Sequence, residues 1–505
     1  MRLKFIVTNT SASLLKSFFL FSILIFLLTG CSVSKNYSPA KKFSKEELQQ
    51  DFSLLRNILE KKHPSLYWYT PKDSMDNYFN QGYRNIEDSM TELRFGWKII
   101  APLTDKIHCG HTSFSMSKRW VKFIRNKRLP SFPLHLKIWA DTMVVIANLN
   151  NKDSVIKKGT LITAINGIPN HELLKKMFSY MSQDGYADNV NNIRLSMSFP
   201  YFHRNIFGLF DMYSIRYIDS SGIEKNALIP FYRPPGDSFN KKSPFIKREK
   251  LSRQQKLQMI RLFKTDTATD LAIIRLNSFS KGHLQKFFKR SFRKIKKVNA
   301  QNLVIDIRNN GGGDINNFVS LTRYIRNTPF KVADTAVSIA KNFRPYSKYI
   351  KADFLEKTAL FFLTRKKNDG QYHFGYWEKR TIKPKRHNHF NGNVYVLMNG
   401  LTFSASALFC NSVKGQNNVL LVGEETGGGW YGNSGIVIPD IVLPATKLKV
   451  RLPFFRLVQY NHIPVKGTGI LPDIVVNPTV EDVRNNIDRK MEVVKEMILK
   501  NKNDN

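Results

Sequence analysis

The sequence predicts a multi-domain α/β protein. It has a helical N-terminal region, a middle region rich in β-strands, and a C-terminal domain built on a mixed, largely parallel sheet. Strand-like apolar runs alternate with helical patterns across residues 267–476, which is typical of parallel β-α-β units. Two of these runs, at residues 303–307 and 394–398, end in turns that contain glycine. The chain has 505 residues, so two or three domains are expected.

The first 31 residues predict an export signal. Basic residues at positions 2, 4 and 16 precede an apolar run at 18–28 that is too short for a comfortable membrane span. Leu28-Thr29-Gly30-Cys31 closes the run and resembles a bacterial lipobox. We therefore expect Cys31 to be the lipidated first residue of the mature chain, with an uncleaved anchor helix as the alternative. Residues 32–43 are polar and aperiodic, which suits a tether.

The expected location is the cell envelope. A serine after Cys31 resembles lipoproteins of the outer membrane. The net charge is 79 − 39 = +40, which raises nucleic acid as a partner. Export argues against nucleic acid, so we expect none. Basic clusters such as residues 286–297 and 383–386 are interpreted as solvated faces. The alternative is that they bind anionic lipid.

The N-terminal region, residues 44–127, starts with a well-marked helix at 44–62. Ser44 and Glu47 have the spacing of a capping box. Leucine and phenylalanine side chains at positions 48, 52, 55 and 59 follow one helical face. A second helical segment is predicted at 91–103, and it precedes a stretch that contains two histidines and a cysteine.

A strand, a sharp turn and a helix that starts on a serine occur at residues 394–413. Asn399-Gly400 breaks the strand, and an apolar run at 405–413 has helical spacing. This arrangement exposes a nucleophilic hydroxyl, here that of Ser404, in front of the free N–H groups of a helix N-terminus. The alternative is that Ser404 or Ser406 only caps the helix.

Three consecutive glycines follow the strand at 303–307. Gly311, Gly312 and Gly313 allow a tight turn, a close approach to another group and bare N–H groups. A phosphate cradle is disfavoured, because no Gly-Lys-Ser/Thr follows and the spacing is not G-x-G-x-x-G.

Four segments together resemble the tail-specific (C-terminal-processing) serine peptidase family, which includes tricorn-like members. They are DIRNNGGG at 306–313, TFSASALF at 402–409, LVGEETGGG at 421–429 and GILPDI at 469–474. The resemblance implies hydrolysis of peptide bonds in a polypeptide substrate, through an acyl-enzyme on Ser404. It also implies an oxyanion hole made by the backbone N–H groups of Gly312 or Gly313 and of Ala405.

One departure concerns the base. In the Ser–Lys branch of the family a lysine stands 25 residues after the nucleophile, where this chain has Gly429. The resemblance to the histidine-using, tricorn-like branch points instead to His111, in Cys109-Gly110-His111-Thr112, with Cys109 where an aspartate is usual. Glu425 is the candidate for orienting His111, and Glu424 and Asp105 are its rivals.

Residues 157–167, KKGTLITAING, resemble part of the PDZ signature, with Thr160 in place of its aspartate. We therefore expect a PDZ-like domain at 128–233. Its sheet edge either accepts an extended peptide by strand addition or serves only as a spacer. A linker at 234–255, a catalytic domain at 256–480 with a basic insertion near 340–391, and a closing helix within 481–505 complete the prediction.

The chain has three cysteines, Cys31, Cys109 and Cys410. With Cys31 lipidated, the other two either form a disulfide or stay free and buried, and we expect free thiols. A metal site at His108, Cys109 and His111 is disfavoured, because no HExxH motif or paired CxxC accompanies them. No metal, nucleotide or organic cofactor is expected.

The function predicted is a serine-type peptidase that acts on cell-envelope or extracellular polypeptides. The alternative is an inactive peptidase-fold protein that binds peptides or glycans at the envelope. The missing lysine favours the alternative, and His111 favours the enzyme.

Overall fold

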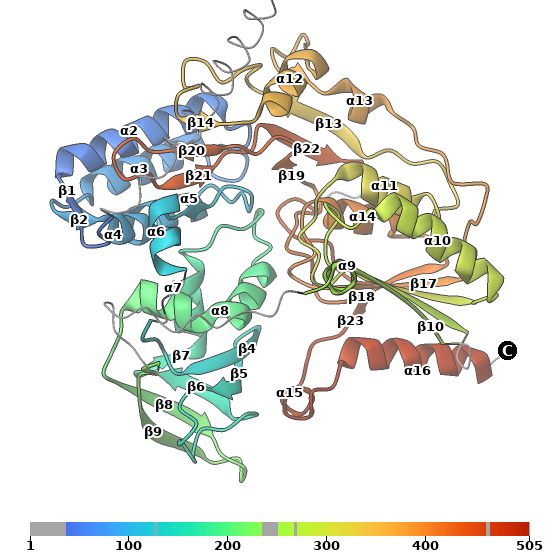
Figure 1. The fold of residues 1–505 in the computed structure, drawn as a ribbon, viewed down its shortest axis with the longest axis horizontal. Helices are drawn as coiled ribbons and strands as arrows, with labels where there is room; N and C mark the ends of the chain where they lie inside the picture. The colour runs from blue at the N-terminus through green and yellow to red at the C-terminus, as the bar shows by residue number, and fades with distance from the viewer. Residues whose placement is uncertain are drawn as a thin grey trace, which may run out of the picture.

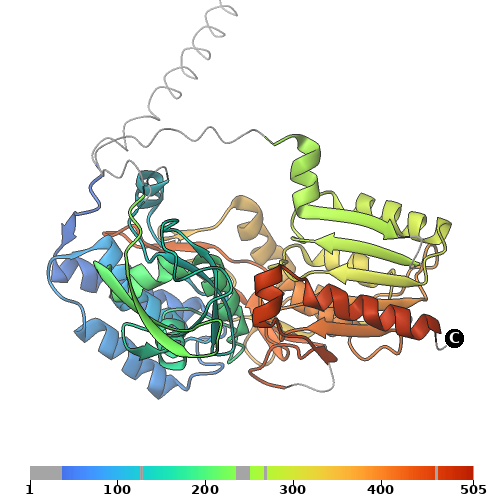
Figure 2. The same ribbon diagram turned by 90° about the horizontal axis from the view of Figure 1, so that it is seen from below.

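The computed structural model describes residues 37–125, 127, 129–234, 251–266, 270–460 and 465–503. The predicted signal peptide with Cys31 and most of the linker lie outside these residues. Figure 2 shows the N-terminal and middle regions together on one side of the molecule and the α/β domain on the other. Within the described residues, no helix is long and apolar enough to cross a membrane.

The N-terminal region is helical, as predicted. Ser44 caps its first long helix, and both hydrogen bonds of the capping box with Glu47 are present. The predicted helix at 91–103 is divided into two α-helices joined by a π-helix. The elements are β1 (Lys42–Phe43), α2 (Lys45–Lys62), α3 (Lys72–Arg84), β2 (Met90–Thr91), α4 (Glu92–Phe95), the π-helix η1 (Gly96–Ile100), α5 (Ala101–Asp105), β3 (Phe114–Ser115) and α6 (Lys118–Ile124).

The middle domain is an antiparallel sheet in the order β4-β5-β6-β8-β9, with β7 beside β6, and two helices. It has a hydrophobic core of its own, separate from that of the α/β domain. Its elements are β4 (Leu134–Trp139), β5 (Thr142–Asn148), β6 (Leu161–Ile165), β7 (Ile168–Pro169), α7 (Asn170–Phe178), α8 (Asn189–Phe207), β8 (Met212–Ile218) and β9 (Glu224–Pro230).

Helix α8 covers the free edge of β4. The backbone N–H of Ile138 donates to Ser196 Oγ over 2.8 Å, and the same hydroxyl lies 3.3 Å from the Ile138 carbonyl oxygen. A peptide that added itself to this edge would need both groups of Ile138. The geometry therefore favours the spacer interpretation of this edge over a peptide-binding groove.

The α/β domain has a six-stranded sheet in the order β10-β11-β12-β17-β18-β23. All neighbouring strands are parallel except β10 and β11, so the predicted mixed, largely parallel sheet is confirmed. The strands are β10 (Arg261–Asp266), β11 (Leu271–Leu276), β12 (Asn302–Asp306), β17 (Asn393–Met398), β18 (Val419–Gly423) and β23 (Ile474–Val475).

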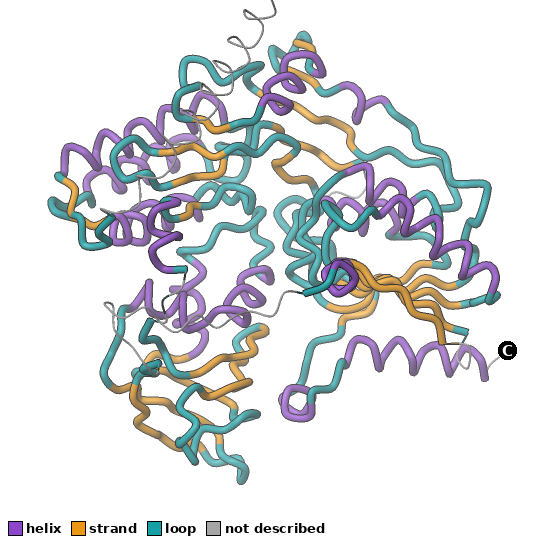
Figure 3. The backbone as a smooth tube through the Cα atoms, in the orientation of Figure 1, coloured by secondary structure: helices purple, strands orange, loops and turns teal. Residues whose placement is uncertain are grey.

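Helices cover both faces of this sheet, which explains its continuous apolar strands. Figure 1 shows α10, α11 and α14 on one face and α16 on the other, and Figure 3 shows the strands as one layer between them. Leu303 and Ile305 join the large core on the first face, and Val304 packs with Val494 on the second. The covering helices are α10 (Leu284–Lys297), α11 (Ile315–Thr322), α14 (Ala405–Val413) and α16 (Arg489–Asn503). Two further helices, α9 (Arg253–Ile260) and α15 (Val480–Asn485), precede the sheet and α16 respectively.

The end of the chain differs from the prediction of a single closing helix. Asn486 adopts a left-handed conformation, with φ of 57°, and separates α15 from α16. Asparagine tolerates this conformation better than most residues.

Two further sheets accompany the six-stranded sheet, and the second of them includes β3 of the N-terminal region. Their orders are β15-β16-β13-β22-β19 and β14-β20-β21-β3. The basic insertion supplies β14, α12, β15, β16 and α13, so it is a folded part of the domain. The elements are β13 (Ala333–Ser338), β14 (Ile350–Lys351), α12 (Phe354–Leu363), β15 (Arg365–Lys366), β16 (Tyr372–His373), α13 (Gly375–Lys379), β19 (Gly432–Gly435), β20 (Asp440–Val442), β21 (Lys449–Arg451) and β22 (Phe455–Gln459).

The N-terminal region is attached firmly to the α/β domain. Strand β3 pairs with β21, which places residues 114–115 in a sheet of the α/β domain. The buried carboxylate of Asp51 accepts hydrogen bonds from the N–H groups of Ala445 and Thr446 and from the Thr446 hydroxyl, at 2.7–2.9 Å. These contacts fix the loop that follows α5 against the α/β domain.

Candidate active site

Ser404 lies at a strained turn between β17 and α14. Its φ is 54° and its ψ is −123°, which a residue with a side chain rarely adopts. The predicted strand–turn–helix is therefore present, with the serine at the elbow. The Ser404 side chain makes no capping hydrogen bond, and Ser406 is buried with its hydroxyl unpartnered, so the capping alternative is wrong.

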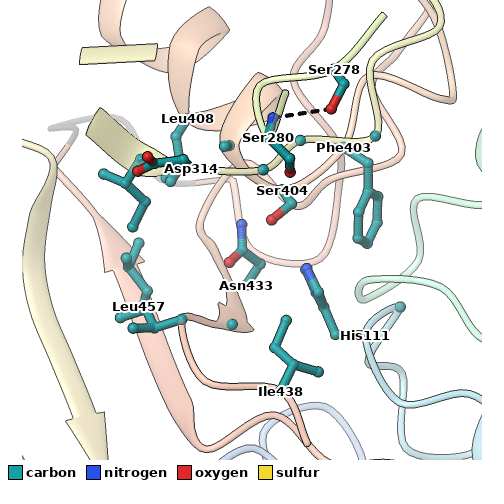
Figure 4. A pocket seen from close by; sticks show the side chains of 18 of the residues that line it. His111, Ser278, Ser280, Asp314, Phe403, Ser404, Leu408, Asn433, Ile438 and Leu457 are labelled. Atoms are coloured by element: carbon teal, nitrogen blue, oxygen red, sulfur yellow. Dashed lines mark hydrogen bonds between the residues drawn. The ribbon is translucent and has the colours of Figure 1, made fainter. Parts of the chain in front are cut away.

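The elbow opens into a cavity of about 700 Å³. The glycine turn, the elbow, the loop with His111, and residues of β19 and β21 all line it. Figure 4 shows Ser404, His111 and Asn433 around this space. The predicted nucleophile, base and glycine turn thus come together, although about 300 residues of sequence separate His111 from Ser404.

The glycine turn contacts the elbow at van der Waals distance. Gly312 has a φ of 100°, and a Cβ on it would lie 2.7 Å from Ser404 Cβ and 2.8 Å from the Phe403 carbonyl oxygen. Gly313 has a φ of 139°, and a Cβ there would lie 2.4 Å from the backbone nitrogen of Ser280. Both positions therefore require glycine.

The N–H groups at this turn are not equivalent. Gly312 N–H donates to Asn310 Oδ1 over 3.0 Å, so its predicted part in an oxyanion hole is wrong for this arrangement. The N–H groups of Gly313 and Ala405 have no hydrogen-bond partner within the described residues, and both residues line the cavity. They are the donors that remain for a developing oxyanion.

His111 reaches the cavity from the loop between α5 and β3. Its ring packs on the ring of Phe403, with centroids 4.8 Å apart, and its Nδ1 is buried without a partner in the described structure. In Figure 4 a nitrogen of this ring points into the cavity on the side of Ser404. Burial, with the charges of Arg451 and Arg194, lowers the pKa of His111 to about 3, so the ring is neutral at pH 7.

Asp184 and Arg194 belong to the same surroundings, and the sequence did not reveal them. The buried Asp184 carboxylate accepts the N–H of Gly110 at 2.7 Å and that of Gly429 at 3.4 Å. It thus joins the His111 loop to the glycine-rich block, and burial raises its pKa to about 7. Arg194, whose charge acts on Asp184, donates to the Ser182 carbonyl at 2.5 Å. Neither residue lies in a motif, so only the fold places them here.

Gly429 has no room for the lysine of the Ser–Lys branch. A Cβ on Gly429 would lie 2.5 Å from the Gly432 carbonyl oxygen. The departure from the family pattern therefore extends to the packing of the backbone.

Glu425 is not brought to His111 by a hydrogen bond. Its Oε1 accepts the N–H of Gly469 at 2.6 Å. Glu424 pairs with Lys490 at 3.0 Å, and Asp105 pairs with Lys106 at 3.0 Å. Among the described residues, no hydrogen bond joins any of these three carboxylates to His111 Nδ1, so the orienting role stays a prediction that no such contact supports.

Asn433 is a further polar group at the site. Its side chain is buried, and its Nδ2 has no partner within the described residues. In the view of Figure 4 its amide lies beside Ser404 and His111, to their left. The amide is therefore available to a substrate carbonyl.

Cys109 and Cys410 are both free and buried, as expected, so the disulfide alternative is wrong. Burial raises the pKa of both thiols, to about 11 for Cys109. His108 Nδ1 lies 2.9 Å from the Gly185 carbonyl oxygen. Among the residues that the structure describes, no group of three or more histidine, cysteine, aspartate or glutamate side chains is arranged to hold a metal ion.

A serine at a strained elbow, a neutral histidine and free backbone donors on one cavity define a serine hydrolase site. Residues 270–476 match the family model described as peptidase family S41. This segment is therefore similar to peptidase family S41, and the chain is a serine-type peptidase. No curated protein sequence matches the chain.

Solved structures are similar over most of the chain. Mature CPAF complexed with lactacystin is 14% identical with a TM-score of 0.64, over 91% of this chain and 99% of that one. The photosystem II D1 C-terminal processing protease is 14% identical with a TM-score of 0.39, over 87% and 96%. The tricorn protease is 13% identical with a TM-score of 0.40, over 90% of this chain and 37% of that one. The likeness to CPAF shows a shared multi-domain fold.

The contact between the glycine turn and the elbow gives a prediction with a matched control. Gly312→Ala should abolish covalent labelling of Ser404 by a fluorophosphonate probe, because the new methyl group displaces the elbow. Gly311→Ala should label at near the wild-type rate, because a Cβ at Gly311 meets no atom within 4 Å. Equal labelling of the two variants would contradict the close approach.

Proposed function

We propose that the chain hydrolyses peptide bonds in polypeptides of the cell envelope, through an acyl-enzyme on Ser404 with His111 as the base. The observation that carries the proposal is the common cavity of Ser404, neutral His111 and the free N–H groups of Gly313 and Ala405. It corresponds to the histidine-using, tricorn-like branch, and the absence of space for a lysine at Gly429 supports that branch.

In the first step Ser404 Oγ attacks the carbonyl carbon, and its proton passes to His111 Nε2. The carbonyl oxygen becomes an oxyanion that accepts the N–H groups of Gly313 and Ala405. The imidazolium then gives its proton to the leaving amine, and the peptide C–N bond breaks. Water repeats the sequence on the acyl-enzyme and releases Ser404.

The base role requires the tautomer of His111 that carries a proton on Nδ1. That nitrogen has no acceptor among the described residues, so packing on Phe403 orients the ring instead of a carboxylate. A histidine with a pKa near 3 is a weak base and a strong acid. Its advantage therefore lies in protonating the leaving amine, which is a poor leaving group without a proton.

We also propose a lipid anchor at Cys31. The described structure starts at Tyr37, whose hydroxyl donates to Glu92 Oε2 over 3.0 Å. Six residues of extended chain span at most about 20 Å. An acylated Cys31 would therefore keep the peptidase close to the membrane and to envelope polypeptides.

Ser404→Ala should lose all fluorophosphonate labelling and peptidase activity, because Ser404 carries the only hydroxyl among the described elbow residues that line the cavity. Ser406→Ala should keep a measurable part of both. The Ser406 hydroxyl is buried in the first turn of α14, and it makes no hydrogen bond among the described residues. The measurement is the increase in mass of each purified variant after reaction with the fluorophosphonate probe. Loss in Ser406→Ala with retention in Ser404→Ala would reverse the assignment.

The pH dependence follows from the lowered pKa of His111. The base must be neutral, so kcat/KM falls only as the pH drops through the folded-state pKa, about 3 here. At pH 5 we expect more than half of the plateau value, whereas a histidine with a pKa of about 6.5 would be only ~3% neutral. The measurement is kcat/KM between pH 4 and 8, with circular dichroism at each pH to check folding.

His111→Ala should stay folded in this experiment and turn over ~10²–10⁴-fold more slowly. A wild-type acid limb centred near pH 6.5 would contradict the buried environment of the ring. Full activity in His111→Ala would contradict the base assignment.

For the anchor, intact-mass analysis of protein from the membrane fraction should show an acylated N-terminal Cys31 with nothing before it. Cys31→Ser should block both acylation and cleavage, because the lipobox needs the thiol. A wild-type chain that retains residues 1–30, or that has an unmodified Cys31, would refute the anchor.

A further inference from the structure

The wall of the active-site cavity carries an unneutralised positive charge. Arg451, at the end of β21, lines the cavity and is exposed. Its side chain makes no hydrogen bond or ion pair among the described residues, and only its backbone is bonded, to the Ser113 carbonyl at 3.0 Å. Its neighbour on β21, Lys449, pairs with Asp440. Arg451 is therefore the free cation beside the described catalytic groups.

Arg194 adds a second cation to the lining of the active-site cavity. Its charge is opposed by that of the buried Asp184. Asp314, which also lines the cavity, is occupied at the start of α11, where its carboxylate accepts the N–H of Asn316 at 2.9 Å. Among the described residues, neither Asp314 nor Asp440, which lies opposite Arg451 on β20, forms an ion pair with Arg451.

A second cavity, of about 390 Å³, borders the first at Ser113 and Arg194, which line both. It lies between the N-terminal region and α8, and Arg194 is its only charged lining residue among those described. Its walls are mainly aromatic and aliphatic, and include Trp97, Phe114, Trp120, Val121, Tyr201 and Phe202. Val121 and Tyr201 are 50% and 44% exposed, so apolar surface is open to a ligand.

The chemistry decides which part of a substrate faces these groups. The acid that protonates the leaving amine must lie on the leaving side of the scissile bond, and that acid is His111. Ser113, two residues after His111, borders both cavities. A peptide that leaves the elbow over His111 therefore meets Arg451 and Arg194 and then the apolar cavity.

We infer that Arg451, Arg194 and this second cavity form a leaving-side subsite, which takes a carboxylate next to an aromatic or aliphatic side chain. The carboxylate comes from an aspartate or glutamate or from the end of the chain. The inference rests on the proposed function, because it assumes that the peptide is cleaved at Ser404. Charge complementarity and the continuity of the two cavities support this occupant over a neutral ligand.

The test uses matched peptides that differ only in one carboxylate. One pair has a free-acid or an amidated end, and another has aspartate or asparagine at the second to fourth leaving-side positions. We expect the full mature chain at pH 8 to cleave the charged member of at least one pair with about tenfold higher kcat/KM, mainly through KM. Preference in the first pair identifies a chain end, and preference in the second identifies a side chain.

Arg451→Gln should remove this preference, and Arg451→Lys should restore part of it. Arg290→Gln, which removes one exposed positive charge on α10 away from both cavities, should keep it in full. Val121→Asp should lower kcat/KM more for peptides that have an apolar residue beside the carboxylate than for peptides that have glycine there. Equal rates for charged and neutral peptides, or an unchanged preference in Arg451→Gln, would overturn the inference.

Binding separates this inference from the proposed function. Fluorescence anisotropy of the same labelled peptides with Ser404→Ala needs no turnover, and it should show the same dependence on carboxylate and on Arg451. If the wild-type chain neither labels nor cleaves, the proposed mechanism fails while the binding data still decide the subsite. Binding that ignores the carboxylate would overturn the subsite even in an active peptidase.

Discussion

The close approach of two turns at the carboxyl ends of neighbouring parallel strands governs the geometry of the whole site. Strands β12 and β17 are neighbours, so the glycine turn and the Ser404 elbow leave the sheet side by side. The turn then approaches so closely that a Cβ at Gly312 would lie 2.7 Å from Ser404 Cβ. This contact holds the serine in its rare conformation, and it places the N–H groups of Gly313 and Ala405 on the cavity. Strain of this kind persists only where the surroundings fix it.

The second requirement is that His111, a residue of the N-terminal region, is held at a fixed position relative to the Ser404 elbow. His111 is held by a sheet that joins β3 to β21 and by Asp184, which accepts N–H groups from Gly110 and Gly429. A buried carboxylate with two donors from different regions fixes both backbones at once. The catalytic arrangement therefore depends on the packing between regions as well as on the α/β domain, and Asp51 contributes the same kind of connection farther away.

The features predicted from sequence were those with a local cause. The capping box of α2, the strands of the parallel sheet and the elbow at Ser404 each follow from short patterns, and the structure has all three. The direction of side chains had no such local cause. Adjacency in a motif placed Glu425 near the site but not its carboxylate, which faces Gly469. Asp184, Arg194 and Arg451 have no motif, because they reach the cavity only through contacts between distant segments.

Electrostatics connects His111 to the cavity wall. Arg451 and Arg194 oppose protonation of His111, as its burial does, and together these effects keep the ring neutral but weakly basic. An anion beside these arginines would favour the imidazolium and raise the pKa of His111 toward its ordinary value. The oxyanion that the proposed mechanism forms at Gly313 and Ala405 would act in the same direction, since both residues line the same cavity. The His111 ring would then become a better base when the substrate occupies the site. Without substrate, the ring would be too weakly basic to activate Ser404 or water efficiently.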